Sequence, residues 1–159
     1  MKKFQLIYFT LLTISITLHA ADTAHQIMSA IEAKDRERVR QLINPDNIEL
    51  ELNVDGLRVT PLYYAISPLG DENIALDLIE LAANINARIV YNTTPLHFAA
   101  YYNRQIIVQR LLEAGALRTI KDSCGYTPAA SARANGHEHI AEFIDNWQGI
   151  PEIKEPDVE

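Results

Sequence analysis

Thr94-Pro95-Leu96-His97-Phe98-Ala99 is the central copy of a stretch that occurs three times in this chain. The other two copies are Thr60-Pro61-Leu62-Tyr63-Tyr64-Ala65 and Thr127-Pro128-Ala129-Ala130-Ser131-Ala132. Their threonines are 34 residues apart (60 to 94) and then 33 residues apart (94 to 127). A period of this size indicates an array of stacked repeats, in which each unit buries its apolar face against its neighbours.

Each copy has the composition of a helix start. A threonine side chain can accept a hydrogen bond from a backbone N–H of the first turn. Proline is tolerated just after it, because the N–H that proline lacks would have no partner within the helix. We therefore expect a short helix after each threonine, with small alanines that let the helix approach its neighbours closely.

The period and the T-P-L-H-x-A pattern resemble ankyrin repeats. The resemblance continues beyond the helix start, where Gly115 stands in a position to end an outer helix in the left-handed conformation. The apolar face of that outer helix is expected from Ile106, Ile107, Leu111 and Leu112. Residues 83–87 are similar to the G-A-D-V-N-A run of the family.

The resemblance implies an all-α ankyrin-repeat solenoid of about four helix-turn-helix repeats with β-hairpin fingers, over residues 22–147. The expected repeats are residues 22–55, 56–89, 90–122 and 123–147, and the first is a capping repeat without the T-P-L-H start. Residues 148–159 are acidic and contain two prolines, which is typical of a flexible tail.

Two departures from the regular period stand out. Ile48, Leu50, Leu52 and Val54 alternate with polar residues before Asp55-Gly56, a pattern that predicts a longer β-hairpin in the first finger. The second repeat has one extra residue near Ser67-Pro68-Leu69-Gly70, which is expected to reshape its corner between helices. Both features are compatible with tolerated loop variation and with a partner-specific surface.

Residues 1–20 have the order of a secretory signal peptide. Lys2 and Lys3 precede an uncharged apolar run from Phe4 to Leu18, and Ala20 is small enough for cleavage after it. An uncleaved anchor and a helix packed on the domain are the alternatives. The leader predicts a bacterial protein in the periplasm, or a secreted protein as the second possibility.

The overall charge limits the kinds of partner. The formal net charge is −7, and removal of two lysines with the leader would make it −9. A chain this acidic repels phosphate backbones and anionic lipids, so we expect no nucleic acid and no membrane insertion after the leader is cleaved. The same charge favours a protein partner with a basic patch. We expect the chain to act as a monomer.

The candidate chemical groups favour structure over catalysis. In the ankyrin family the histidine equivalent to His97 forms hydrogen bonds that tie neighbouring repeats together. His137 and His139 are two residues apart on a helix and point to different faces, so they make a poor metal pair. Cys124 is the single cysteine and is expected to be exposed at the tip of the last finger. We therefore predict no enzyme, no catalytic residue, no metal site and no cofactor.

Partner-binding positions follow from the ankyrin resemblance, which places partners on finger tips and at the ends of the inner helices, a concave strip. The expected contact residues are Val90, Tyr91, Thr93, Tyr101, Tyr102, Ser123 and Tyr126. Tyrosine is enriched at binding hot spots because it is large, amphipathic and semi-rigid. The alternative is that these tyrosines pack against one another and fill the groove.

These features predict an exported module that binds a protein partner without catalysing a reaction. A factor secreted by a host-associated bacterium to engage a host protein is the first alternative. A small metal-binding or enzymatic protein is the second. The sequence names neither the partner nor the organism.

Overall fold

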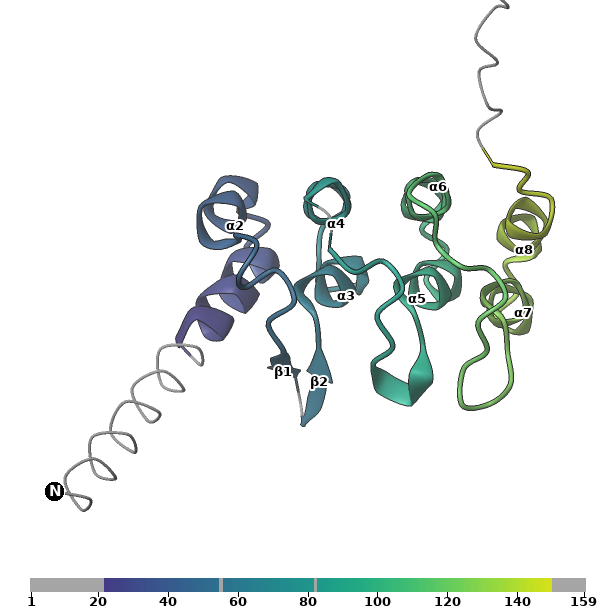
Figure 1. The fold of residues 1–159 in the computed structure, drawn as a ribbon, viewed down its shortest axis with the longest axis horizontal. Coiled ribbons are helices and arrows are strands. Elements are labelled where there is room, and N and C mark those ends of the chain that lie inside the picture. Colours follow the sequence, from purple (N-terminus) through teal and green to yellow (C-terminus); the bar gives the residue numbers. More distant parts are fainter. Residues whose placement is uncertain (1–21, 55, 82, 150–159) are drawn as a thin grey trace, which may run out of the picture. The chain divides into compact units, whose positions relative to one another are not determined.

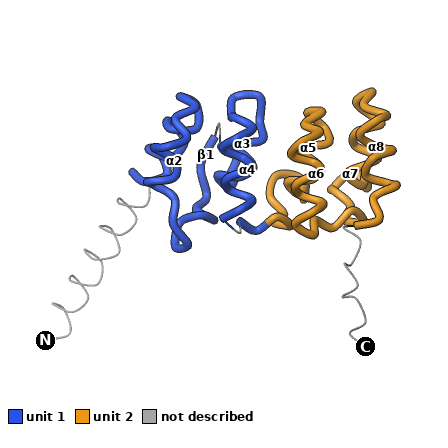
Figure 2. Tube along the Cα trace, turned by 90° about the horizontal axis from the view of Figure 1, so that it is seen from above, with its two compact units in different colours: residues 1–84 blue, residues 85–159 orange. Residues whose placement is uncertain are grey.

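A computed structural model of the chain describes residues 22–54, 56–81 and 83–149 (Figure 1). The predicted leader (residues 1–20) and residues 150–159 of the predicted tail lie outside the described residues. The chain forms two compact units, residues 1–84 and residues 85–159 (Figure 2). The boundary between them falls inside the segment that we expected to be the second repeat.

The described part of unit 1 begins with a helix over residues 22–32 and continues with α2, Arg36–Leu42. The Asp35 side chain caps α2 by accepting a hydrogen bond from the backbone N–H of Arg38. The expected hairpin of the first finger follows, formed by β1 (Leu52–Val54) and β2 (Leu57–Val59). The strands are antiparallel, with Leu52 opposite Val59. The alternating pattern thus predicted this finger correctly.

Helices α3 (Pro61–Ile66) and α4 (Glu72–Glu80) complete unit 1. Thr60 caps α3 by accepting from the N–H of Tyr63, as the helix-start pattern predicted. The corner between the helices is a tight turn in which Gly70 N–H donates to Ser67 O at 3.1 Å. Gly70 is buried there, and a Cβ atom at this position would overlap the backbone of Ala65.

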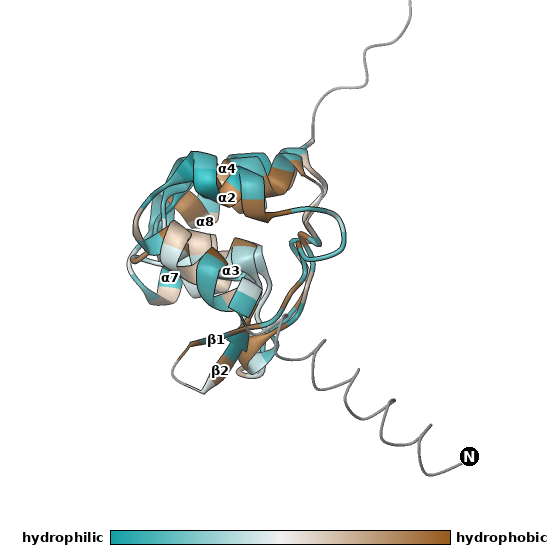
Figure 3. Ribbon diagram, turned by 90° about the vertical axis from the view of Figure 1, so that its left-hand side faces the viewer, coloured by the Kyte–Doolittle hydropathy of each residue, from teal (hydrophilic) through white to brown (hydrophobic). Residues whose placement is uncertain are grey.

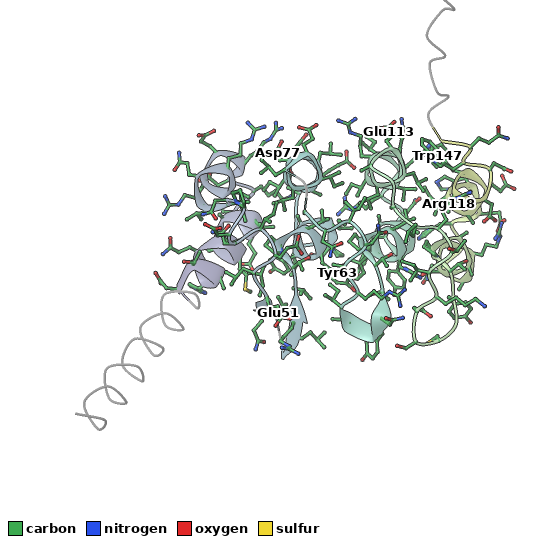
Figure 4. All side chains as sticks on the ribbon, in the orientation of Figure 1. Glu51, Tyr63, Asp77, Glu113, Arg118 and Trp147 are labelled. Atoms are coloured by element: carbon green, nitrogen blue, oxygen red, sulfur yellow. The ribbon has the colours of Figure 1, made fainter. Side chains whose placement is uncertain are left out.

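A buried carboxylate joins α2 to α4 in unit 1 (Figure 4). Both carboxylate oxygens of Asp77 accept hydrogen bonds from Arg36 and also from Arg40. The Asp77 side chain is 6% exposed, whereas those of Arg36 and Arg40 are 47% and 49% exposed. Its hydrogen bonds with Arg36, reinforced by Arg40, hold the pKa of Asp77 below its usual range, against the opposing effect of burial.

Unit 2 contains the 3₁₀ helix η1 (Val90–Asn92) followed by two helical pairs. The first pair is α5 (Pro95–Tyr101) with α6 (Gln105–Glu113), and the second is α7 (Pro128–Ala134) with α8 (Glu138–Asp145). The inner helices α5 and α7 pack on each other, and the outer helices α6 and α8 do so as well. Arg118 donates to the carbonyls of Ile144 and Asp145 and thereby caps the end of α8 (Figure 4).

The core of unit 2 comes from one apolar stripe on each helix. In Figure 3 the helices carry both hydrophilic (teal) and hydrophobic (brown) residues along their ribbons. On α6 the buried residues are Ile107, Val108, Leu111 and Leu112. The expectation for Ile106 was wrong, because this residue is 53% exposed. Residues advance about 100° around a helix, so Ile107, Val108, Leu111 and Leu112 occupy one arc of about 140°, and Ile106 lies outside it. Gly115 has φ = 91°, which confirms its predicted left-handed conformation.

In residues 22–54, 56–81 and 83–149, β-strands occur only in the first finger. The second and third fingers are instead turns. At their bases the N–H of Ile89 donates to Thr93 O, and the N–H of Asp122 donates to Tyr126 O. None of the helices in the described ranges has the length and apolarity required to cross a bilayer.

Candidate protein-binding surface

The second finger presents a tyrosine in an unfavourable backbone conformation. Tyr91 has φ = 54° and ψ = 30°, and Asn92 also has a positive φ of 59°. For a bulky residue this left-handed conformation costs about 1–2 kcal/mol. The Tyr91 side chain is nonetheless 73% exposed, so packing of the ring in a core does not offset the strain. Backbone strain of this kind is concentrated at functional sites, so Tyr91 is a candidate contact residue.

The third finger is built around Asp122. Its Oδ1 atom accepts hydrogen bonds from the backbone N–H groups of Cys124 and Tyr126, both at 2.9 Å. Gly125 has φ = 85°, which completes the turn. Cys124 is exposed, as the register predicted. The Tyr126 side chain is 48% exposed, so this finger also presents an aromatic ring to solvent.

Hydrogen bonds hold the second and third fingers together. Ser123 N–H donates to Tyr91 O at 2.9 Å, and the Asn92 side-chain amide donates to Lys121 O at 2.9 Å. These two bonds place the tips of both fingers side by side within unit 2. Three predicted contact residues, Tyr91, Ser123 and Tyr126, are therefore brought together by the fold.

His97 links the start of α5 to the third finger. Its Nε2 atom lies 3.0 Å from the carbonyl oxygen of Tyr126, which can only accept, so Nε2 carries the proton. The other ring nitrogen, Nδ1, accepts from the backbone N–H of Thr94 at 3.2 Å. Burial lowers the pKa of His97, in keeping with this neutral form. The structural role that the family resemblance implied for His97 is confirmed.

Tyr101 and Tyr102 lie at the end of α5, as the register predicted, but they have different environments. Tyr101 is the last residue of α5 and is 45% exposed. Tyr102 is half-buried and packs edge-on against Phe98 (ring centroids 4.7 Å apart) and Tyr101 (4.9 Å). Burial raises the pKa of the Tyr102 phenol. Tyr102 therefore packs between Phe98 and Tyr101, whereas Tyr101 contacts Tyr102 and still exposes part of its ring to solvent.

We call the exposed tyrosines Tyr91, Tyr101 and Tyr126, all in unit 2, the tyrosine surface. The predicted neighbours Val90 and Thr93 are half-buried in the second finger, and Ser123 is exposed in the third. Seven-residue α5, about 10 Å long, separates the fingers from Tyr101. Thr93 Oγ1 donates to Val90 O at 2.7 Å, so these two residues shape the finger.

The same fingers carry two cations that were not predicted as contact residues, Arg88 and Lys121. They are 33 residues apart and occupy equivalent positions in consecutive repeats, which is the signal that could have identified them. Both are exposed. The described part of the chain contains no group of three His, Cys, Asp or Glu side chains that could hold a metal ion.

Residues 78–132 match the family described as "Ankyrin repeats (many copies)". The chain is 30% identical over 127 residues to E3 ubiquitin-protein ligase Ufd4 of Drosophila melanogaster, covering 78% of this chain and 4% of that protein. It is 32% identical over 99 residues to transient receptor potential cation channel subfamily A member 1 of Homo sapiens (60% of this chain, 9% of that protein). It is 34% identical over 86 residues to Rabankyrin-5 of Mus musculus (54% and 7%).

The chain belongs to the ankyrin-repeat family, as the family match and its three Thr-Pro helix starts show. It spans less than a tenth of the length of each of these three relatives. One of these relatives is named as a ligase, another as a channel and the third as neither, so the shared segment does not specify one activity. Ankyrin repeats are in general modules for protein–protein interaction, without catalytic activity of their own.

Proposed function

We propose that this chain is an exported protein that binds another protein non-covalently through the tyrosine surface of unit 2. The proposal rests on one observation: Tyr91 is 73% exposed although its backbone is in the left-handed conformation. Strain of this kind persists where the surrounding structure maintains it, and it is concentrated at functional sites. The two hydrogen bonds between the fingers are the structure that maintains it here.

The chemistry of the surface supports protein binding rather than a reaction. Tyr91 and Tyr126 are presented from fingers that are fixed by hydrogen bonds, and Tyr101 ends a helix. A rigid aromatic side chain loses little conformational entropy on binding and buries a large area. Three such side chains on one unit supply the anchors for a protein partner.

Export is supported by the sequence of residues 1–20 alone. A short cationic start, an apolar run and a small residue at the expected cut are the features that a secretion machinery recognises. The periplasm is the proposed location. Cell fractionation with intact-mass measurement tests it: a mature chain that begins at Ala21 in the periplasmic fraction supports the proposal, and an unprocessed chain retained in the cytoplasm contradicts it.

The binding function is tested by cross-linking the full chain in its native envelope fraction and identifying the captured protein. The test variant carries Tyr91→Ser, Tyr101→Ser and Tyr126→Ser. The matched control carries Leu57→Ser and Leu69→Ser, which remove exposed apolar side chains from unit 1 (47% and 59% exposed).

We expect the wild type and the control to capture the same protein, and the tyrosine variant to lose it. Loss of one hot-spot side chain commonly weakens binding by about 2 kcal/mol, or roughly thirtyfold. Equal capture by a tyrosine variant with unchanged circular dichroism would show that the binding surface lies elsewhere.

A further inference from the structure

The charge of the chain is distributed unevenly, and the tyrosine surface lies in its basic part. Residues 85–137 contain six basic and two acidic residues, a net charge of +4, whereas the whole chain has −7. The remaining residues therefore carry −11 together. The basic residues are Arg88, Arg104, Arg110, Arg118, Lys121 and Arg133, and the acidic ones are Glu113 and Asp122.

Several of these cations are already engaged within unit 2. Arg110 pairs with Glu113, and Arg133 pairs with two acidic residues of α8. Arg118 donates to the last carbonyls of α8. By contrast, in the described part of unit 2 neither Arg88 nor Lys121 forms an ion pair, and both are exposed.

Arg88 and Lys121 occupy the same place in adjacent fingers. Each stands immediately before the residue whose N–H closes its finger, Ile89 in the second and Asp122 in the third. The Lys121 carbonyl also accepts the hydrogen bond from Asn92 that joins the fingers. Helices in contact lie about 8–10 Å apart, so equivalent positions in the two repeats are separated by about 10 Å. The acidic group nearest in sequence, Asp122, uses its carboxylate to hold two backbone N–H groups of its own finger.

Local charge, rather than total charge, governs contact with a partner. At physiological ionic strength the interaction between exposed charges is screened over about 8 Å. The net charge of −7 predicts a partner with a basic patch, yet most of the acidic residues lie outside residues 85–137. The cations in the fingers that carry Tyr91 and Tyr126 therefore determine which charges can be accommodated at the surface itself.

We propose that the tyrosine surface binds an extended acidic segment of a protein, with carboxylates three residues apart that pair with Arg88 and Lys121. An extended chain in the polyproline II conformation has three residues per turn and rises about 3.1 Å per residue, so carboxylates three residues apart lie on the same side and span about 9 Å, close to the expected separation of the two cations. An apolar side chain between the carboxylates would pack on Tyr91 and Tyr126. This inference rests on the proposed protein-binding function and specifies the chemistry of the partner.

A single-stranded nucleic acid also combines negative charge with stacking groups, but it fits less well. Strong binding to phosphate backbones commonly uses about six to ten cationic contacts, whereas two unpaired cations are identified here. The rest of the chain, at −11, would repel a long polyanion. A short acidic peptide places its few charges only where the two cations lie.

The test measures fluorescence anisotropy of a labelled peptide on titration with the full chain. The peptide repeats the sequence glutamate-phenylalanine-serine, so its glutamates are three residues apart. A lysine version of it and a single-stranded DNA with the same number of charges serve as comparison probes. The test variants are Arg88→Ser with Lys121→Ser, and Arg88→Glu with Lys121→Glu. The matched control is Arg38→Ser, which removes an exposed cation from unit 1.

We expect the acidic peptide to bind the wild type and the Arg38→Ser control equally, and to weaken as salt is added. The double serine variant should bind it roughly tenfold less tightly, since two exposed ion pairs are lost. The double glutamate variant should prefer the lysine peptide, a reversal that misfolding cannot produce. Equal binding by the wild type and the double serine variant would overturn the inference, as would tighter binding of the DNA or of the lysine peptide by the wild type.

Failure of the acidic-peptide inference can be distinguished from failure of the proposed binding function. If the cross-linked partner is lost in the tyrosine variant but the acidic peptide fails to bind, the surface binds protein and the acidic chemistry is wrong. If the tyrosine variant keeps its partner, the proposed binding surface itself is wrong.

Discussion

Replacing Asp77 with asparagine should destabilise unit 1 in a way that depends on pH. The carboxylate accepts two hydrogen bonds from Arg36 and two from Arg40, each pair with one donor to each oxygen. Asparagine keeps the shape but removes the charge and turns one acceptor into an N–H donor that faces guanidinium donors. At least two charge-assisted hydrogen bonds are therefore lost.

The size of the expected stability loss depends on how exposed Arg36 and Arg40 are. Hydrogen bonds to charged groups contribute about 1.5–3 kcal/mol each when well shielded from water. Here both arginine side chains are about half exposed (47% and 49%) and recover hydration when the carboxylate is lost, which lowers the cost. We expect a net loss of about 2 kcal/mol in the free energy of unfolding, or about 1 M in the urea midpoint.

The pH dependence supplies the sharper test. The pKa of Asp77 is lowered in the folded state, so its stabilisation is present above the ordinary value of about 3.9 and is lost as pH falls through the lower folded value. Urea unfolding followed by helical circular dichroism should show the full difference at neutral pH and a shrinking one below about pH 4. Asp46→Asn, at an exposed turn residue of the same unit, should change little. A difference that is absent at neutral pH, or constant down to strong acid, would refute the role of Asp77.

Three further substitutions test other parts of the fold. Gly70→Ala should lower thermal stability by about 2 kcal/mol, because the new Cβ would overlap the Ala65 backbone; an unchanged melting temperature would contradict this close approach. Burial lowers the pKa of His97, so its contribution is full above the ordinary value of about 6.5 and is lost as pH falls through the folded value; His97→Gln should therefore flatten the stability profile below about pH 6.5. Tyr91→Gly should raise stability by about 1 kcal/mol in urea unfolding while weakening capture of the partner, and a loss of stability would show that the ring supports the finger.

Local sequence patterns predicted the elements of the fold that depend on nearby residues. Thr60 and Thr127 cap helices that begin with proline, because an N-cap and a first-turn proline act within four residues of each other. Gly115 adopts the left-handed conformation because it follows the last turn of α6. The hairpin of the first finger was also visible in the alternation of apolar residues before Asp55-Gly56.

Features that depend on distant residues or on local strain were not predicted. Asp77 meets Arg36 across 41 positions, and nothing near it in the sequence marks its carboxylate as buried. Tyr91 adopts a conformation that its intrinsic preference disfavours, because the hydrogen bond to Ser123 and the turn before Thr93 hold it there. The different environments of Tyr101 and Tyr102 likewise depend on packing against Phe98, which the repeat register alone does not specify.

The bonds between the second and third fingers have a consequence for how the surface can change over evolutionary time. The bond from Ser123 to Tyr91 joins main-chain atoms, and His97 reaches the third finger through the main-chain carbonyl of Tyr126. The side chains at positions 91, 123 and 126 therefore take no part in these links. Mutation can exchange them one at a time and alter which partner is recognised, while the framework that presents them is inherited unchanged.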